Sequence, residues 1–514
     1  MKKIFFSAVL FAVFASGCTK NFDELNTDPN RPSLTNPAVA AGAANALFSS
    51  AISRGLMEAH EFQRVQSLYA DLFAQYYANS ATYFNSDKYQ VNQGWLNEGW
   101  IRFYPRDIKN LVDIINSPNA TNNQKQIARI WKVFLFHRMV DFYGDIPYFN
   151  AGNPEMAEKF DNQKDIYYDF FKELDDAVKK TDASGSYDGK DVIYAGNVAN
   201  WKKFANTLRL RLAMRVSRVD PAKAKTEAEA AIAAGIFGSN AENALAKVNN
   251  LLPNALNQIT GWNEFRMSAT MESVLVGYKD PRAPEYFAPA VGAGANSPYA
   301  GKFNGIVNGT SSADLALDEN RFDNNSNVSD RFSRNKMNEN PRIVLTYAEA
   351  CFLMAEAAMK NYAGATNAKT WYERGITASM NQFGINDGAR ISAYINNATD
   401  IPTTPAFTNR PVSTLPVAFS SVPDEQFEQI QVQKWLAVYP DGFEGWSNFR
   451  RTGFPKFYQP ANYDPSTDVT AGNFIQRIPY TDFMKGLNSQ GVAAAETRMG
   501  GGGQAVKLWF AGGR

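Results

Sequence analysis

A segment between residues 83 and 100 combines aromatic rings with amides and contains few aliphatic side chains. A pyranose presents an apolar C–H face that stacks on a ring, and its hydroxyls need hydrogen-bond donors and acceptors. Aromatic rings flanked by amides supply both the stacking surface and the hydrogen-bond partners. The segment is therefore a candidate sugar-binding loop, and its candidate ligand contacts are Tyr83, Tyr89, Trp95 and Asn97. For Trp95, packing against the neighbouring helix pair is an equally good interpretation.

A second group of aromatic and polar side chains lies near the middle of the chain, in a stretch without helical periodicity. Its candidate ligand contacts are Trp262, Asn263, Arg266 and Tyr286. By contrast, Trp201 and Trp435 lie on apolar helical stripes and are predicted to belong to the framework.

The chain carries few residues of the kinds that form familiar catalytic centres. Its two histidines, His60 and His137, lie in helical stretches without a second metal ligand at zinc-site spacing, so each is interpreted as a helix-face or core histidine. No phosphate loop, dinucleotide fingerprint or Gly-x-Ser-x-Gly elbow is present. A pair of glycosidase carboxylates is harder to exclude, because it needs only the right separation in space. We expect a protein that is not an enzyme.

An acidic stretch is the one candidate for a cation site. Its acids are Asp314, Asp318, Glu319, Asp323 and Asp330. Ca²⁺ requires six to eight oxygens, but the stretch lacks the EF-hand spacing and its glycine. A solvated loop is the preferred interpretation, so no metal or other cofactor is expected, with Ca²⁺ as the alternative.

The first 17 residues predict a signal peptide. Lys2 and Lys3 precede an apolar run from Ile4 to Phe14, which is too short for a bilayer core that needs about 20 residues. Three small residues then stand directly before Cys18, which is typical of a lipobox. Cys18 is therefore the predicted lipidation site, with acyl chains that anchor the protein in a membrane. The alternative is an ordinary signal peptide followed by a cysteine.

The composition excludes some classes of partner. Lys and Arg number 52 against 51 Asp and Glu, so no net field attracts nucleic acid. Only two cysteines are present, and once Cys18 carries lipid, Cys351 has no partner for an internal disulfide. The stability of this 514-residue chain must come from its core.

Helical periodicity organises the rest of the chain. Residues 18–37 are expected to form a polar tether and docking segment, and residues 38–514 a single body. Helix pairs are expected at about 38–234 and 342–440, irregular insertions at about 235–341 and 385–421, and a C-terminal segment at 441–514. The predicted fold class is mostly α with few short strands, as a curved scaffold of stacked helix pairs.

Several separated motifs carry a resemblance to a known family. They are the lipobox at Cys18 with the segment Asn21 to Asn30 behind it, YGDIPY at 143–148, WKKFANTLRLRLAMRV at 201–216, YAEA at 347–350, AEA at 355–357, QKW at 433–435, GFEGW at 442–446, RRTG at 450–453 and RIPY at 477–480. By their order and spacing, the chain resembles the SusD/RagB family of nutrient-binding outer-membrane lipoproteins. The resemblance spans essentially the whole mature chain.

This resemblance implies a helical body with tetratricopeptide-like pairs and a more irregular half built on long insertions. It also implies a lipid-anchored place in the outer membrane, facing the cell exterior, as a lid over a SusC-like TonB-dependent transporter. Such proteins capture oligosaccharides, or in some members peptides, for import. Their ligand contacts tend to come from an early loop and a middle loop, which matches the two aromatic regions in order.

These inferences predict a cell-surface lipoprotein that binds an oligosaccharide or polysaccharide without changing it and delivers it to the transporter. Peptide capture within the same transport system is the first alternative. A surface glycoside hydrolase is less favoured, and a purely structural lid is a third possibility.

Overall fold

The structure, a computed structural model, describes residues 37–152, 159–185, 191–294 and 296–514. The predicted signal peptide, Cys18 and most of the predicted tether lie outside these residues. Among the helices within the described ranges, none is both long enough and apolar enough to cross a membrane.

Helices dominate the first half of the described chain. They are α3 (Pro37–Gly55), α4 (Ala59–Glu61), η1 (Phe62–Asp71), α5 (Gln93–Arg102), η3 (Phe103–Ile108), α6 (Lys109–Asn116), α7 (Asn122–Tyr143), α8 (Gln163–Lys180), α9 (Val198–Val216) and α10 (Pro221–Ala234). A capping box starts α7: the N–H of Gln124 donates to Thr121 Oγ1 (3.3 Å) and the N–H of Thr121 donates to Gln124 Oε1 (2.8 Å). α7 packs against α6 and α8, and α9 packs against α10, so each helix buries its apolar face on a neighbour.

The second half alternates short elements with longer helices. Its helices are α11 (Ala255–Thr260), α12 (Ala269–Gly277), α13 (Ala283–Tyr286), α14 (Ser312–Leu315), α15 (Tyr347–Met359), α16 (Ala368–Gln382), α17 (Gly388–Ile395), α18 (Pro423–Ala437), α19 (Gly442–Thr452), α20 (Asp482–Leu487) and α21 (Ser489–Met499). Single 3₁₀ turns are η2 (Ser86–Lys88), η4 (Asn240–Glu242), η5 (Asp318–Asn320), η6 (Phe322–Asn324), η7 (Asp330–Phe332), η8 (Arg334–Lys336) and η9 (Trp509–Ala511). α15 packs against both α16 and α18.

The strands are short and form two antiparallel pairs. β1 (Tyr77–Asn79) pairs with β3 (Phe265–Met267), and β2 (Ala244–Ala246) pairs with β4 (Arg342–Leu345). In the first pair Tyr77 lies opposite Met267 and Asn79 lies opposite Phe265. Each pair therefore ties a segment of the long irregular stretch to a segment far away in sequence.

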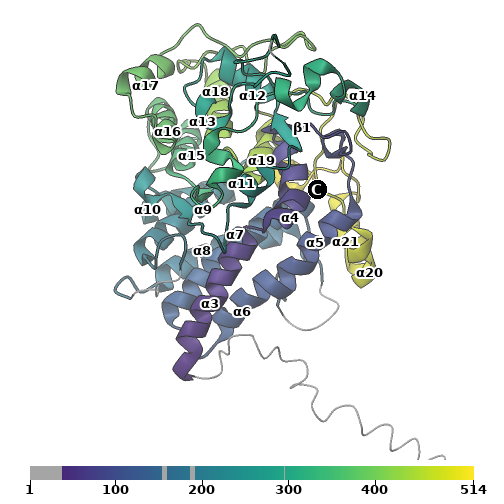
Figure 1. Ribbon diagram of the computed structural model, residues 1–514. Helices are drawn as coiled ribbons and strands as arrows, with labels where there is room; N and C mark the ends of the chain where they lie inside the picture. Colours follow the sequence, from purple (N-terminus) through teal and green to yellow (C-terminus); the bar gives the residue numbers. More distant parts are fainter. Residues whose placement is uncertain (1–36, 153–158, 186–190, 295) are drawn as a thin grey trace, which may run out of the picture.

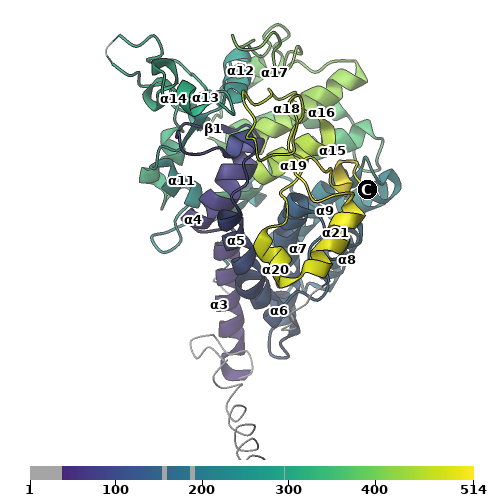
Figure 2. The ribbon, with the colours of Figure 1, turned by 90° about the vertical axis from the view of Figure 1, so that its right-hand side faces the viewer.

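Several early helices and the short helices from the middle of the chain lie toward different ends of the molecule (Figure 1). The helices α3, α6, α8 and α10 lie toward one end, while β1 and the short helices α12, α13 and α14 lie toward the other. α3 begins at the first of these ends, far from β1. Figures 1 and 2 show α20 and α21 beside α5, and α20 packs against α5, so the C-terminal segment returns to the first half of the chain.

A network of buried ion pairs joins the central helices. On α9, Arg211 donates to Glu349 of α15 (2.6 Å) and Arg215 pairs with Glu444 of α19. Glu444 also accepts from Lys434 of α18 (2.8 Å). Buried charges of this kind are tolerated only when each finds a partner. The network therefore fixes how these helices meet.

The fold class predicted from the sequence is confirmed, since helices predominate and the strands are few and short. Two details differ. α5 begins at Gln93, so Trp95 and Asn97 lie in a helix and not in a loop, because Asn92 caps that helix by accepting from the N–H of Trp95 (3.2 Å). Both stretches expected to be irregular contain helices: α11 to α14 lie inside 235–341, and α17 lies inside 385–421.

Candidate binding site

The β1–β3 ladder brings the two predicted aromatic regions side by side. Just beyond the ladder, the N–H of Ser80 donates to the carbonyl of Glu264 (3.0 Å) and Ser80 Oγ donates to the carbonyl of Asn263 (2.9 Å). The loop that follows β1 carries Tyr83, and the turn before β3 carries Trp262. Residues about 180 apart in sequence therefore share one surface.

Three aromatic rings, each at least partly exposed, and one amide lie on these linked segments and form what we call the aromatic site: Tyr83, Trp262, Asn263 and Phe322. Tyr83 is 69% exposed and Phe322 is 44% exposed, although both are large apolar rings. Trp262 is half-buried and Asn263 is exposed. Rings left in water together with polar groups are the feature that a stacking ligand uses.

Arg266 holds two members of the aromatic site in place. Its Nη2 donates to Asn263 Oδ1 (2.9 Å), and its Nε donates to the carbonyl of Phe322 (3.1 Å). Its guanidinium also lies over the Phe322 ring, 5.3 Å from the centroid. Burial lowers the pKa of Arg266 to about 10, although the negative charge of Asp323 acts to raise it.

The opposite side of the site is built on α4 and η1. The Trp262 ring stacks on the exposed ring of His60, with centroids 5.1 Å apart. Gln63 Nε2 donates to Glu264 Oε2 (2.5 Å). Burial raises the pKa of Glu264, while the hydrogen bond from Gln63 and the charge of His60 lower it. A carboxylate and two rings thus border the exposed amide of Asn263.

A third segment closes the aromatic site from the side of α14. Ser312 Oγ donates to the carbonyl of Thr82 (2.6 Å), which brings the chain around α14 next to the loop that carries Tyr83. Figure 2 shows α4, α11, β1 and α14 along one edge of the molecule. The site therefore lies on an accessible edge.

Three predicted contact residues are buried, so this structure does not present their side chains to a ligand. Tyr89 is 4% exposed and packs edge-on against Phe73, and Tyr286 is fully buried with its hydroxyl donating to the Leu436 carbonyl (2.8 Å). Arg266 is 3% exposed and acts through Asn263 and Phe322. The two tyrosine rings pack in the core, and the guanidinium of Arg266 forms hydrogen bonds within the protein.

The two α5 candidates occupy intermediate positions. Trp95 is half-buried, with its ring edge-on to Phe84 at 5.5 Å, so packing accounts for part of its surface. Asn97 is half-buried, and its Oδ1 makes no hydrogen bond to any described residue. Neither residue belongs to the aromatic site as defined here.

The sequence reasoning missed Phe322, which belongs to the aromatic site, and His60, which supports it by stacking on Trp262. Phe322 lies in the acidic stretch that was interpreted as a solvated loop, and His60 was interpreted as a helix-face histidine without a role. A large apolar ring among acids, in a stretch without periodicity, is the signal that could have identified Phe322. Within the described ranges, no group of three or more His, Cys, Asp or Glu side chains is arranged to hold a metal ion.

Comparison with known proteins decides the family. A family model described as SusD-like, Susd and RagB outer membrane lipoprotein, matches residues 24–511. The chain belongs to the SusD-like family. The resemblance carried by the sequence motifs is thereby confirmed.

Solved structures of SusD-like proteins share the fold of this SusD-like chain. A chitin-binding SusD homolog from Flavobacterium johnsoniae superposes with a TM-score of 0.82 at 29% identity, over 91% of this chain and 98% of that one. A second structure, named as a chitin-binding protein, gives 0.77 at 29% identity, over 91% and 100%. A SusD-like protein from Bacteroides thetaiotaomicron gives 0.80 at 26% identity, over 91% and 98%. No curated protein was found that matches the chain.

Proposed function

We propose that this SusD-like protein captures a glycan at the cell surface and passes it, chemically unchanged, to a TonB-dependent transporter of the SusC type. The observation that supports this most strongly is the aromatic site, where Tyr83, Trp262 and Phe322 leave ring surface in water around Asn263. Rings bind the apolar faces of sugar units, and the exposed amide of Asn263 binds hydroxyls.

Chitin oligosaccharides are the first ligands to test, because two of the structural neighbours are named as chitin-binding. A chain of N-acetylated sugars offers both ring faces and amides. The amide of Asn263, oriented by Arg266, provides a donor and an acceptor for such a group. Affinity is expected to be modest, because an open surface leaves part of each sugar in water.

The direct test is calorimetric titration of the soluble chain, from Thr19 onward, with chitin oligosaccharides and with plant, host and microbial polysaccharides. Products are then analysed chromatographically. Intact glycan with a measurable Kd, weakened by Tyr83→Ala and Trp262→Ala, is the expected result. Phe149→Ala removes an exposed ring between α7 and α8 and serves as the matched control.

Other outcomes would replace the proposal. Cleaved product would make the protein a glycoside hydrolase, and binding of peptides alone would make it a peptide-capturing protein. Glycan binding that survives loss of all three rings would move the site elsewhere on the molecule.

The proposed location rests on Cys18, which we propose carries the lipid. Labelling with a fatty-acid probe in the producing cell should mark the wild type and not Cys18→Ala. Protease added to intact cells should degrade the protein if it faces the exterior. Protection from the protease would place it on the inner leaflet.

A further inference from the structure

We infer that residues 22–25 of the chain's own N-terminal tether dock in an apolar groove between α5 and α20. The groove lies where α5, η3 and α20 meet. Its volume of about 300 Å³ is about 20 times the space that one water needs. Figure 2 shows α20 beside α5, and the two helices pack on each other. The inference goes beyond glycan capture and does not rest on it.

Apolar side chains form the walls of the groove. Those that matter here come from α5, η3, α20 and the segment after residue 158: Trp100, Ile101, Tyr104, Phe160, Phe483 and Leu487. Three of them are exposed to water, Ile101 by 46%, Phe483 by 37% and Leu487 by 58%. Large apolar side chains that gather in one place and stay open to water are typical of a surface that another apolar segment covers.

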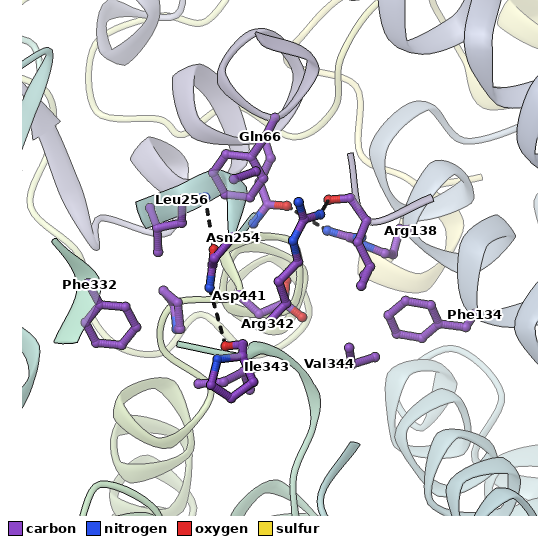
Figure 3. A pocket seen from close by; sticks show the side chains of 15 residues that line it. Gln66, Phe134, Arg138, Asn254, Leu256, Phe332, Arg342, Ile343, Val344 and Asp441 are labelled. Carbon is purple, nitrogen blue, oxygen red and sulfur yellow. Dashed lines mark hydrogen bonds between the residues drawn. The ribbon is translucent and has the colours of Figure 1, made fainter. Parts of the chain in front are cut away.

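An internal cavity elsewhere in the molecule has a different character. Figure 3 shows Arg138 and Arg342 in its wall together with Gln66 and Asp441, and Gln66 Oε1 accepts from Arg138 Nη2 (2.7 Å). Its volume is about 60 Å³, and its polar groups partner one another. The groove between α5 and α20 has no charged side chain in its wall, as far as the structure describes the chain. Its occupant is therefore apolar.

The tether supplies apolar residues of the right size. Phe22 and Leu25 are close enough in sequence to enter one groove together. The match to the SusD-like family model begins at residue 24, ahead of the first described residue, so most of the tether shares sequence with the family. A plain spacer needs only length and flexibility. A segment with a defined sequence and large apolar side chains is better suited to docking.

The tether is long enough to place these residues in the groove. Leu25 precedes Pro37, the first residue of α3, by 12 residues, which span about 40 Å when extended. α3 has 19 residues and is therefore only about 28 Å long. η3, which forms one wall of the groove, packs against α3, so the groove lies within reach. A segment attached in this way has an effective concentration in the millimolar range, so weak apolar contacts suffice to hold it.

Docking determines how the body stands at the membrane. With Phe22 in the groove, only four residues separate it from the proposed lipidation site at Cys18, a span of about 13 Å. The end of the body that carries α5 and α20 is then held close to the lipid anchor. Release of the segment lets the body move away from the membrane by the full length of the tether.

Cross-linking tests the docking in the whole chain from Thr19 onward, where Cys351 is buried. Asn21→Cys combined with Lys485→Cys, which replaces an exposed residue of α20, should be joined within one chain by a short bismaleimide. Asn21→Cys combined with Leu317→Cys, which lies beside α14 and is 47% exposed, should not be joined. Peptide mass spectrometry identifies the link. Links between two chains would overturn the inference and assign the groove to a second copy.

Proteolysis gives a second test that needs no new cysteine. A protease that cleaves after Glu24 should cut the wild type about tenfold more slowly than Leu487→Ser, because cleavage tracks the fraction of undocked tether. Leu487 is exposed, so this variant keeps the fold. Val39→Ser, which changes an exposed residue of α3, should be cut as slowly as the wild type. Equal rates in all three proteins would overturn the inference and leave the groove to a partner such as the transporter.

Discussion

The imidazole of His60 stacks on the indole of Trp262, with ring centroids 5.1 Å apart and ring planes at 28°. One face of the indole is thereby supported by a helix, and a sugar would stack on the other. The pair links α4 to the turn before β3, and so joins the framework to the proposed ligand surface.

Replacing Trp262 by alanine should weaken glycan binding about tenfold. An aromatic anchor at a binding surface contributes roughly 1–2 kcal/mol, and the variant loses that stacking surface. Titration calorimetry with the best glycan measures the change. Trp371→Ala, which removes a half-buried indole of α16, should bind as the wild type does. Equal losses in both variants would indicate a general loss of folding.

Replacing Arg266 by methionine should lower glycan affinity although its buried side chain touches no ligand. The variant frees Asn263 and the Phe322 backbone, so both must be ordered again on binding. We expect a less favourable binding entropy and a loss of about 1 kcal/mol. Circular dichroism separates this from unfolding. An unchanged Kd would show that the orientation of Asn263 does not matter.

The buried carboxyl of Asp71 should make stability depend on pH. Burial raises its pKa from 3.8 to about 7, so between these values the folded state binds the proton more tightly than the unfolded state. Stability attributable to this group therefore falls as pH rises from about 4 to about 7, and is constant above that range. Relative to Asp71→Asn, the wild type should lose about 2–4 kcal/mol over this interval. Urea unfolding at several pH values measures this, and parallel profiles would contradict it.

The pair of Glu356 and Arg451 should be costly to break. Arg451 donates to both carboxylate oxygens of Glu356 (2.6 and 2.7 Å), and both side chains are almost fully buried. Glu356→Gln leaves a buried guanidinium without its counter-ion, so a loss of about 3–5 kcal/mol is expected in urea unfolding.

Two further variants interpret that result. Adding Arg451→Met to Glu356→Gln should recover most of the loss, because the stranded charge is removed. Lys369→Ala breaks an exposed pair with Glu373 and should cost at most about 0.5 kcal/mol. A double variant no more stable than Glu356→Gln would show that the loss comes from packing.

Helical periodicity predicted much of the fold, because apolar spacing reports which face of a helix is buried. The pattern at Trp201 and Trp435 predicted framework residues, and both indoles are almost fully buried. The start of α5 was not predicted. It depends on the side chain of Asn92, which caps the helix, and a loop of the same composition would also contain asparagine. Local signals of this kind leave boundaries ambiguous.

The candidate site was predictable by region and not by residue. Composition identified the segments that carry Tyr83 and Trp262. A segment rich in rings and amides but without periodicity has no apolar face that could pack as a whole against the core. Composition could not separate Tyr83 from Tyr89, which lie six residues apart with opposite exposures of 69% and 4%. That difference depends on Phe73 and Tyr463, which both contact the ring of Tyr89 edge-on. Tyr463 comes from a distant part of the chain.

The β1–β3 ladder also bears on how the protein folds. It joins strands that are almost 200 residues apart, and closing so long a loop costs entropy before any contact is gained. The paired helices, whose contacts are local, can form first. Ligand-binding competence should therefore be acquired after most of the helical structure has formed, and only once β3 is available to pair with β1.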